Sequence, residues 1–168
     1  MSREWDALAA LKTFLPAMID AAPQPDLVAG QVVISYPDDD RMQYPTMLFI
    51  VPESGSWEVL TTESLLEQIA VRLYIVVKPQ PTLTSMELMA KSCFDYFAAL
   101  SNALVTDPTL GNEIDEARIN SFDFYPAVEG IAKSVGLDIS ITLQFERNEL
   151  VLPGSGTYPG SDVYPVGG

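Results

Sequence analysis

The chain has 168 residues, with nine basic and 23 acidic side chains, no histidine and a formal net charge of −14. This charge argues against proteins that hold nucleic acid by attraction, which need basic side chains to displace counterions, and against adsorption to an anionic membrane. The length favours a single domain, and 48% of the residues are apolar. That apolar share has two open interpretations: a large core, or apolar surface kept for subunit contacts.

The chain has one cysteine, so no intrachain disulfide can form and nothing marks a secreted scaffold. Residues 1–12 lack the uninterrupted apolar run and the small-residue cleavage site of a signal peptide. No apolar run in the sequence is long enough to span a bilayer. We therefore expect a protein that is made and folded in a cytoplasm.

An N-terminal helix is predicted after Ser2, which can cap it. Its apolar residues fall on one helical face, which contains Trp5, Leu8, Leu11, Leu15 and Met18. Pro16 lies inside this pattern and either kinks the helix or opens a second short turn. The two prolines of the AAPQPD stretch then end the pattern.

Extended segments follow this helix. Residues 31–36 and 46–51 are predicted strands, separated by a polar loop that prolines bound. The sequence PESGSW carries turn residues, so we predict a turn at 52–57 and a short edge strand at 58–62. Residues 66–78 form the longest predicted strand, and its second half is apolar on both faces, which favours a central position in a sheet.

The most regular pattern predicts a helix over residues 85–107. Its apolar residues recur in steps of three and four and are Met86, Met89, Cys93, Phe97, Leu100 and Leu104, widened by Leu88, Phe94 and Val105. Thr84 and Glu87 are predicted to form a capping box, and Glu87 to pair with Lys91 one turn later. Pro108 ends the helix.

Two strands are predicted after this helix, at 118–125 and 135–145. Apolar and polar residues alternate strictly in 135–145, which is typical of a half-buried strand in an antiparallel sheet. Phe97 is predicted to pack between the helix and the apolar face of this strand. The order α-β-β-β-α-β-β indicates an α+β fold in which two helices cover one face of a mostly antiparallel sheet. We assign residues 1–148 to this single domain.

Residues 149–168 are predicted to form an extended, Gly/Pro-rich C-terminal arm. From Leu150 onward the sequence LVLPGSGTYPGSDVYPVGG has no charge pattern and no period. By itself such a segment is expected to be flexible. Our hypothesis is that it docks on a neighbouring subunit or another partner, with Tyr158, Val163, Tyr164 and Val166 as candidate contacts.

The sequence gives little support for catalysis. Without histidine, Ser-His-Asp and Cys-His arrangements are excluded and the usual zinc ligands are missing. No phosphate-binding loop occurs, and the pattern of a dinucleotide-binding loop fails at Pro159. Cys93 lies on the apolar stripe and is interpreted as a small core residue. We therefore predict no enzyme, no catalytic residue, no metal and no cofactor.

Two acidic groups are the best candidates for a charged site. They are Asp38, Asp39 and Asp40 in the first loop, and Glu113, Asp115 and Glu116 before a strand. Three carboxylates could hold a hard cation, but the glycine and the distal glutamate of an EF-hand loop are missing around Asp38. A solvated turn is the better interpretation of the first group. The second group could favour a metal or simply cover a loop, and the loop is the better interpretation.

Several phrases of the chain fall in the same order as in a known family. They are YPTMLFIVP, EQIAVRLYIVV, RINSFDFYP and VGLDISITLQFER, together with AL-x-x-DPTLG at residues 103–111. In these phrases and in the order of its elements, the chain resembles the tail terminator proteins of long-tailed bacteriophages and their relatives at the head–tail joint. The resemblance covers residues 2–147, so the arm lies beyond it.

The resemblance implies a structural virion protein that is assembled in the host cytoplasm. Such proteins form a homo-oligomeric ring, typically of six subunits, that caps the tail tube protein and joins the tail to the head-completion or connector protein. DNA passes through the ring without specific binding, and a wall of like charge does not adsorb it. The two acidic groups are candidate lumen or interface residues. Another neck or tail-tube component of the same fold is the alternative, followed by a small enzyme that uses carboxylates and a metal.

Overall fold

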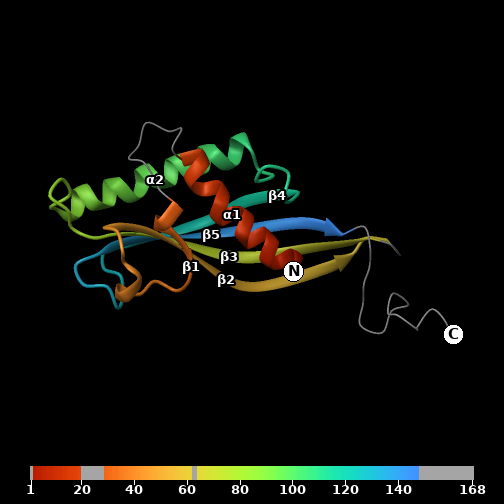
Figure 1. Cartoon of the computed structure of the whole chain (residues 1–168), viewed down its shortest axis with the longest axis horizontal. Coiled ribbons are helices and arrows are strands. Elements are labelled where there is room, and N and C mark those ends of the chain that lie inside the picture. The colour runs from red at the N-terminus through yellow and green to blue at the C-terminus, as the bar shows by residue number, and fades with distance from the viewer. Residues whose placement is uncertain (1, 20–28, 62–63, 148–168) are drawn as a thin grey trace.

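The computed structural model describes residues 2–19, 29–61 and 64–147, and its elements follow the order α-β-β-β-α-β-β. The five strands form one sheet in the order β1-β2-β3-β5-β4. β1 and β2 pair in parallel, and the other three pairs of neighbouring strands are antiparallel. Both helices lie on the same face of the sheet (Figure 1). The predicted α+β class and the predicted order of elements are confirmed.

The N-terminal helix α1 (Arg3–Ile19) begins where the sequence predicts it. The backbone N–H of Trp5 donates to Oγ of Ser2 at 3.2 Å, so Ser2 caps the helix. The helix buries Leu8, Leu11 and Leu15 as predicted, whereas the side chain of Trp5 is 47% exposed. Pro16 lies within the one helix and opens no second turn. α1 packs over β1 (Val32–Ile34) and β2, at one side of the sheet.

The strand β2 (Thr46–Val59) corrects the prediction of a turn at 52–57 and a separate edge strand at 58–62. β2 is one strand that pairs with β3 along its length, with a bulge between Pro52 and Ser54. β1 pairs with Leu48–Ile50, and no other described strand lies on that side of β2, so the rest of β2 is an edge strand within the described residues. An edge strand tolerates proline and a bulge because its outer N–H groups need no partner strand. The turn-forming residues therefore sit inside a strand.

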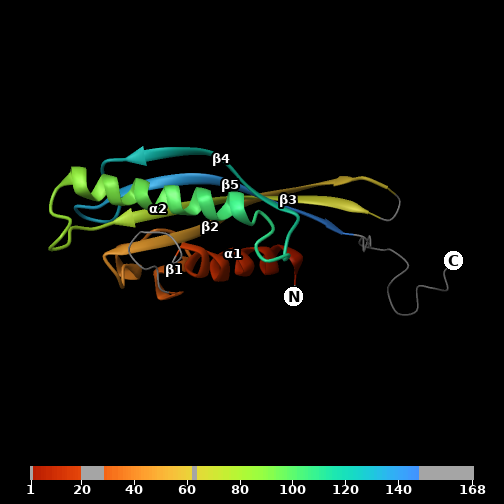
Figure 2. The same ribbon diagram turned by 90° about the horizontal axis from the view of Figure 1, so that it is seen from above.

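The strand β3 (Leu65–Val77) lies between β2 and β5, so the predicted central strand is confirmed. Its residues Ile69, Val71, Leu73, Ile75 and Val77 are buried under the helices. The hairpin of β2 and β3 extends past the ends of both helices (Figures 1 and 2). Neither of the two helices in the described part of the chain covers the sheet at that end.

The helix α2 (Met86–Thr106) starts one residue later than a cap at Thr84 requires. Ser85 is the N-cap, with extended backbone angles, and its Oγ accepts from the N–H of Leu88 at 3.2 Å. The third helical residue is then Leu88, which cannot reach back to the cap, so the predicted capping box is wrong. The predicted pair between Glu87 and Lys91 is wrong as well, because Nζ of Lys91 binds Oδ2 of Asp95 at 2.8 Å.

Ser85→Ala is therefore expected to lower the free energy of unfolding by about 1 kcal/mol, because it removes the side-chain acceptor of an N-terminal N–H group. Thr84→Ala is the matched control, expected to change it by less than about 0.5 kcal/mol. Urea denaturation of both variants makes the comparison. If Thr84→Ala lowers the free energy of unfolding more than Ser85→Ala does, Thr84 and not Ser85 is the N-cap.

The buried face of α2 is rotated from the predicted stripe. The buried residues are Met89, Ser92, Cys93, Tyr96, Ala99, Leu100, Ala103 and Leu104. Met86, Leu88, Phe94 and Val105 are exposed, so their assignment to the core side is wrong. Small residues at 92, 99 and 103 let the helix approach β3 and β5 closely, which apolarity alone does not reveal. Cys93 is fully buried, as interpreted.

An aromatic cluster joins α2 to the edge strand β4 (Glu116–Tyr125). It consists of Phe94, Phe97, Phe122 and Phe124, with ring centroids 4.8 to 5.9 Å apart. Phe97 is half-buried and lies 4.8 Å from Phe122, at the margin of the core. Phe97 is predicted to pack between the helix and strand 135–145, but its ring contacts Phe122 on the neighbouring strand, β4.

The strand β5 (Val135–Arg147) shows the predicted alternation. Its apolar residues Val135, Leu137, Ile139, Ile141, Leu143 and Phe145 all lie in the core under the helices. The predicted domain boundary at 148/149 and the arm contacts Tyr158, Val163, Tyr164 and Val166 lie outside the described residues, as does the side chain of Met18. Neither helix, over the residues described, has the length and apolarity that crossing a membrane requires.

Candidate interaction surfaces

The face of the sheet opposite the helices, called the open face below, carries an apolar cluster, a pocket and an ion pair. A small second apolar cluster lies on it, formed by Met47, Phe49, Val76 and Ile131. Ile131 comes from the loop between β4 and β5, which folds over the end of the sheet and is held by a hydrogen bond from Oγ of Ser134 to its carbonyl, 2.7 Å long. These buried side chains pack together at this end of the open face.

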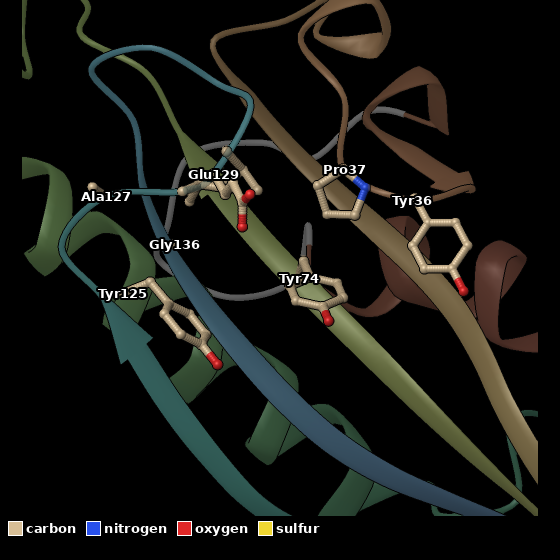
Figure 3. A pocket seen from close by; sticks show the side chains of 9 residues that line it. Tyr36, Pro37, Tyr74, Tyr125, Ala127, Glu129 and Gly136 are labelled. Carbon is tan, nitrogen blue, oxygen red and sulfur yellow. The ribbon is translucent and has the colours of Figure 1, made fainter.

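A pocket of about 430 Å³ lies beside this cluster and is called the tyrosine pocket below. Its lining residues are Tyr36, Pro37, Tyr74, Val76, Tyr125, Ala127, Val128, Glu129 and Gly136. Figure 3 shows the three tyrosines spread across the sheet, from the segment after β1, from β3 and from the end of β4. Gly136 leaves room for the wall of the pocket, because a Cβ on it would lie 2.6 Å from a methyl group of Val128 and would displace that side chain.

The three tyrosines of this pocket offer rings and hydroxyl groups with different exposure. Tyr36 is 73% exposed and Tyr125 is 42% exposed, whereas Tyr74 is half-buried. Burial raises the pKa of Tyr74 above that of a free tyrosine, and the nearby charge of Asp138 acts in the same direction. A neutral phenol packs apolar groups on its face and exchanges hydrogen bonds at its tip. The pocket is thus suited to a flat or cyclic apolar group with polar neighbours.

An ion pair crosses the middle of the open face. Nη1 of Arg72 on β3 donates to Oδ2 of Asp138 on β5 at 2.6 Å, and Nε of Arg72 lies 3.3 Å from Oε2 of Glu53. Asp138 is 3% exposed, and its Oδ1 has no hydrogen-bond partner among the described atoms. Burial raises the pKa of the Asp138 carboxyl, Arg72 opposes this, and the charge of Asp123 adds to it. The pair keeps a buried carboxylate where the sequence indicates a solvated polar face.

The first acidic group predicted from the sequence lies in the loop between β1 and β2. Asp38 caps a short 3-10 turn (Asp39–Arg41), because its Oδ1 accepts from the N–H of Asp40 at 3.1 Å. Oδ1 of Asp39 accepts from Nζ of Lys78 at 2.7 Å. Two of the three carboxylates thus have structural partners, which agrees with a turn.

The second acidic group lies where β4 begins. Oδ2 of Asp115 accepts from the backbone N–H of Glu146 at 2.7 Å, which ties the start of β4 to the end of β5. Glu116 pairs with Arg118 at 3.2 Å. Glu113 lines a shallow hollow beside α1. Each member of this group therefore has a different surrounding.

The two acidic groups lie at opposite ends of the sheet. Glu116 is opposite Gln144, near the end of β5, whereas Lys78 follows the strand end that pairs with Val135 at the start of β5. One copy of the chain therefore does not bring the groups together. Their assignment as lumen or interface residues stays a prediction.

Exposed apolar side chains gather in two further places. Trp57, Val59 and Leu60 form a patch on the protruding hairpin, called the hairpin patch below, and Trp57 is 69% exposed. The aromatic cluster is the other place, because Phe94 and Phe122 are 40% and 46% exposed. The hairpin patch is on an edge strand beside β3, and the aromatic cluster is at the β4 edge. They are two different surfaces.

The phrase AL-x-x-DPTLG forms the turn that follows α2. The carboxylate of Asp107 accepts from Oγ1 and N–H of Thr109, at 2.6 and 3.1 Å, and from the N–H of Gly111 at 2.9 Å. These hydrogen bonds lower the pKa of Asp107, the side-chain bond of Thr109 most of all. Leu110 and Gly111 both have positive φ, and Leu110 is buried. These residues form a turn that hydrogen bonds of Asp107 hold together and that leads the chain into β4.

The structure places no group of three or more acidic or cysteine side chains for a metal ion within the residues that it describes. Burial raises the pKa of the Cys93 thiol to about 12, and its Sγ lies 3.9 Å from the carbonyl oxygen of Ile75. A thiol in this state is not a nucleophile at neutral pH.

Neither a protein-family model nor a curated protein matches the sequence. Among solved structures, one match is the sheath/tube terminator of an extracellular contractile injection system, PVC, in its extended state, determined by cryo-EM. The two chains are 14% identical with a TM-score of 0.34, and the match covers 90% of this chain and 63% of that chain. This chain thus spans less than two thirds of the length of the protein that it matches.

The tyrosine pocket and the pair of Arg72 and Asp138 are not among the sites predicted from the sequence. The pair had a signal: Arg72 interrupts an otherwise apolar half of the central strand, and a lone acid occurs on the alternating strand. Two single charges on neighbouring strands indicate a cross-strand pair once the register is known. The pocket had no such signal, because its tyrosines come from three distant segments.

Proposed function

We propose that this protein is a structural virion protein that forms a closed ring on the end of a phage tail tube and joins the tail to the head connector. The observation that carries the proposal is the order of elements. The resemblance to tail terminators requires α-β-β-β-α-β-β, with the DPTLG phrase directly after the second helix, and the described residues have this order. The ring is assembled in the host cytoplasm and remains in the neck of the virion.

Two features of the surface support a ring. A ring of identical subunits needs two different surfaces that fit each other, since each copy contacts a copy on either side. The hairpin patch and the aromatic cluster are two exposed apolar surfaces on different parts of the sheet. Exposed side chains of this size and kind favour subunit contacts over a larger core as the reason for the apolar composition.

The charge supports passage of DNA without specific binding. Nine basic residues stand against 23 acidic ones, and four of the nine, Arg72, Lys78, Lys91 and Arg118, already pair with carboxylates in the fold. Such a surface offers few free cations to phosphate groups, so DNA is not retained.

Removing the protein from phage production is expected to leave tube assembly intact. Because a terminator stops polymerisation and supplies the joint, the tubes should have uncontrolled lengths and should lie beside heads without tails. Electron microscopy of particles made with and without the protein measures both effects. The control is the same preparation with the protein supplied in trans.

Tails of normal length that attach to heads without the protein would exclude the terminator role. Loss of tubes altogether would favour the alternative, a tail-tube component of the same fold, because a tube subunit is needed for every ring of the tube.

A further inference from the structure

The tyrosine pocket has the chemistry of a site for a proline-containing peptide. Its walls are the rings of Tyr36, Tyr74 and Tyr125, with Pro37 and Val76 between them. Proline-rich segments bind grooves lined by aromatic side chains, because the pyrrolidine ring packs on an aromatic face and the backbone carbonyls accept from nearby hydroxyls.

The chain itself contains such a segment. Residues 148–168 include two Tyr-Pro pairs, Tyr158-Pro159 and Tyr164-Pro165, and a third proline at 153. The prolines restrict the free segment, so less conformational entropy is lost when it binds. The segment has no lysine or arginine, and the charged residue of the pocket wall is Glu129. The charged residues of the segment, Glu149 and Asp162, are acidic like Glu129, so no ion pair can form between them and binding must depend on rings and neutral hydrogen bonds.

The register of the sheet sets the distance that the segment must cover. The pocket lies beside Gly136 at the start of β5, whereas residue 148 follows Arg147 at its end, opposite Leu65. The strand between them is roughly 36 Å long at about 3.3 Å per residue. Tyr158 lies eleven residues beyond Arg147, so the first Tyr-Pro pair reaches the pocket of its own copy only with a fully extended chain laid back along the sheet, roughly 36 Å. The second pair begins six residues later and has a longer reach. A neighbouring copy has no such restriction.

We propose that the tyrosine pocket binds the Tyr-Pro segment, residues 148–168, of a second copy of this chain. The inference rests on the proposed ring, because a ring supplies the second copy at a fixed position. Docking of this kind links each subunit to the next through a strap that lies outside the packed domain.

Disulfide cross-linking of the full chain tests this pairing. One variant carries Ala127→Cys, in the exposed wall of the pocket, and Gly160→Cys, next to the first Tyr-Pro pair. The native Cys93 does not compete, because it is fully buried and its pKa is about 12. The control variant carries Ala98→Cys, exposed on the helix-covered side, with the same Gly160→Cys.

Mild oxidation is expected to join chains of the Ala127 variant into a ladder on a non-reducing gel, and to leave the control largely uncoupled. Adding Tyr36→Ser should slow the coupling roughly tenfold, because it removes one of the three aromatic rings that line the pocket. Tyr36 is 73% exposed, so this change should leave the fold intact. A thermal melt of the Tyr36→Ser variant close to that of the parent protein would confirm that the fold is intact.

Equal coupling in the Ala127 and Ala98 variants would overturn the inference, and so would a cross-link formed only within single chains. Mass photometry of the reduced protein reports the ring separately. If the ring forms but the Ala127 cross-link does not, the strap is rejected and the proposed function is unaffected. The proposed function is tested separately, by electron microscopy of particles made without the protein.

Discussion

Arg72→Ala is expected to destabilise the protein strongly at neutral pH and much less in acid. Asp138 is 3% exposed, and among the described residues its side chain has one ion-pair partner, Arg72, at 2.6 Å. Removing one member of such a pair leaves a buried carboxylate without compensation. We expect a loss of about 2–4 kcal/mol at pH 7, less than the usual range of about 3–5 kcal/mol for a buried pair, because Arg72 itself is one-third exposed.

The pH dependence of this loss has a defined sign. Without Arg72, burial and the charge of Asp123 both raise the pKa of Asp138 in the folded protein, and nothing of comparable strength opposes them. Below the pKa of an unfolded aspartate, about 3.9, both states carry the proton and no charge is buried. As the pH rises through the raised pKa of the folded state, stability is lost, because folding must then bury an ionised carboxyl group.

Urea denaturation of wild type and variant between pH 4 and pH 8 measures the difference. Lys91→Ala is the control, since Lys91 belongs to a largely exposed pair with Asp95 and should change stability by less than about 1 kcal/mol at every pH. A deficit in the Arg72 variant that stays constant across this range would show that Asp138 does not ionise against burial.

Leu100→Ala is expected to lower the free energy of unfolding by about 2–5 kcal/mol, because Leu100 is 0% exposed and its truncation leaves a cavity between α2 and the sheet. Val105 is a matched control on the same helix, since it is 84% exposed. Val105→Ala should change stability by less than about 0.5 kcal/mol. Thermal and urea melts compare the two, and similar losses would mean that α2 is rotated relative to the sheet.

The order of the elements could be predicted from the sequence, because each helix and most strands have a clear period. β2 could not, since its Pro, Gly and Ser residues are typical of a turn and become acceptable only on an edge strand. That edge exists because β1 is three residues long and pairs with a short part of β2, which the sequence pattern does not reveal. The cap at Ser85 was missed by one residue for a similar reason, since Thr84 and Ser85 are equivalent as cap residues in sequence.

The candidate surfaces were less predictable than the fold. The acidic groups are obvious in the sequence, but their separation to opposite ends of the sheet follows from strand register. The tyrosine pocket brings together residues 36, 74 and 125, and only the packing of the loop that contains Val128 encloses it. The exposure of Phe94 and Val105 depends on the rotation of α2, which the small residues of its buried face determine.

The position of β3 in the sheet has a consequence for folding during synthesis. β3 pairs with β2 through a short connection, but its other neighbour is β5, so that Leu73 lies opposite Ile139. While the ribosome makes the intervening residues, the inner edge of the central strand has no partner strand, and its apolar face lacks part of its cover. Unpaired edges of this kind favour association between nascent chains. Among the described residues β5 is the last strand to be synthesised, and it joins β3 to β4. We therefore expect the chain to be most prone to aggregate just before β5 leaves the ribosome.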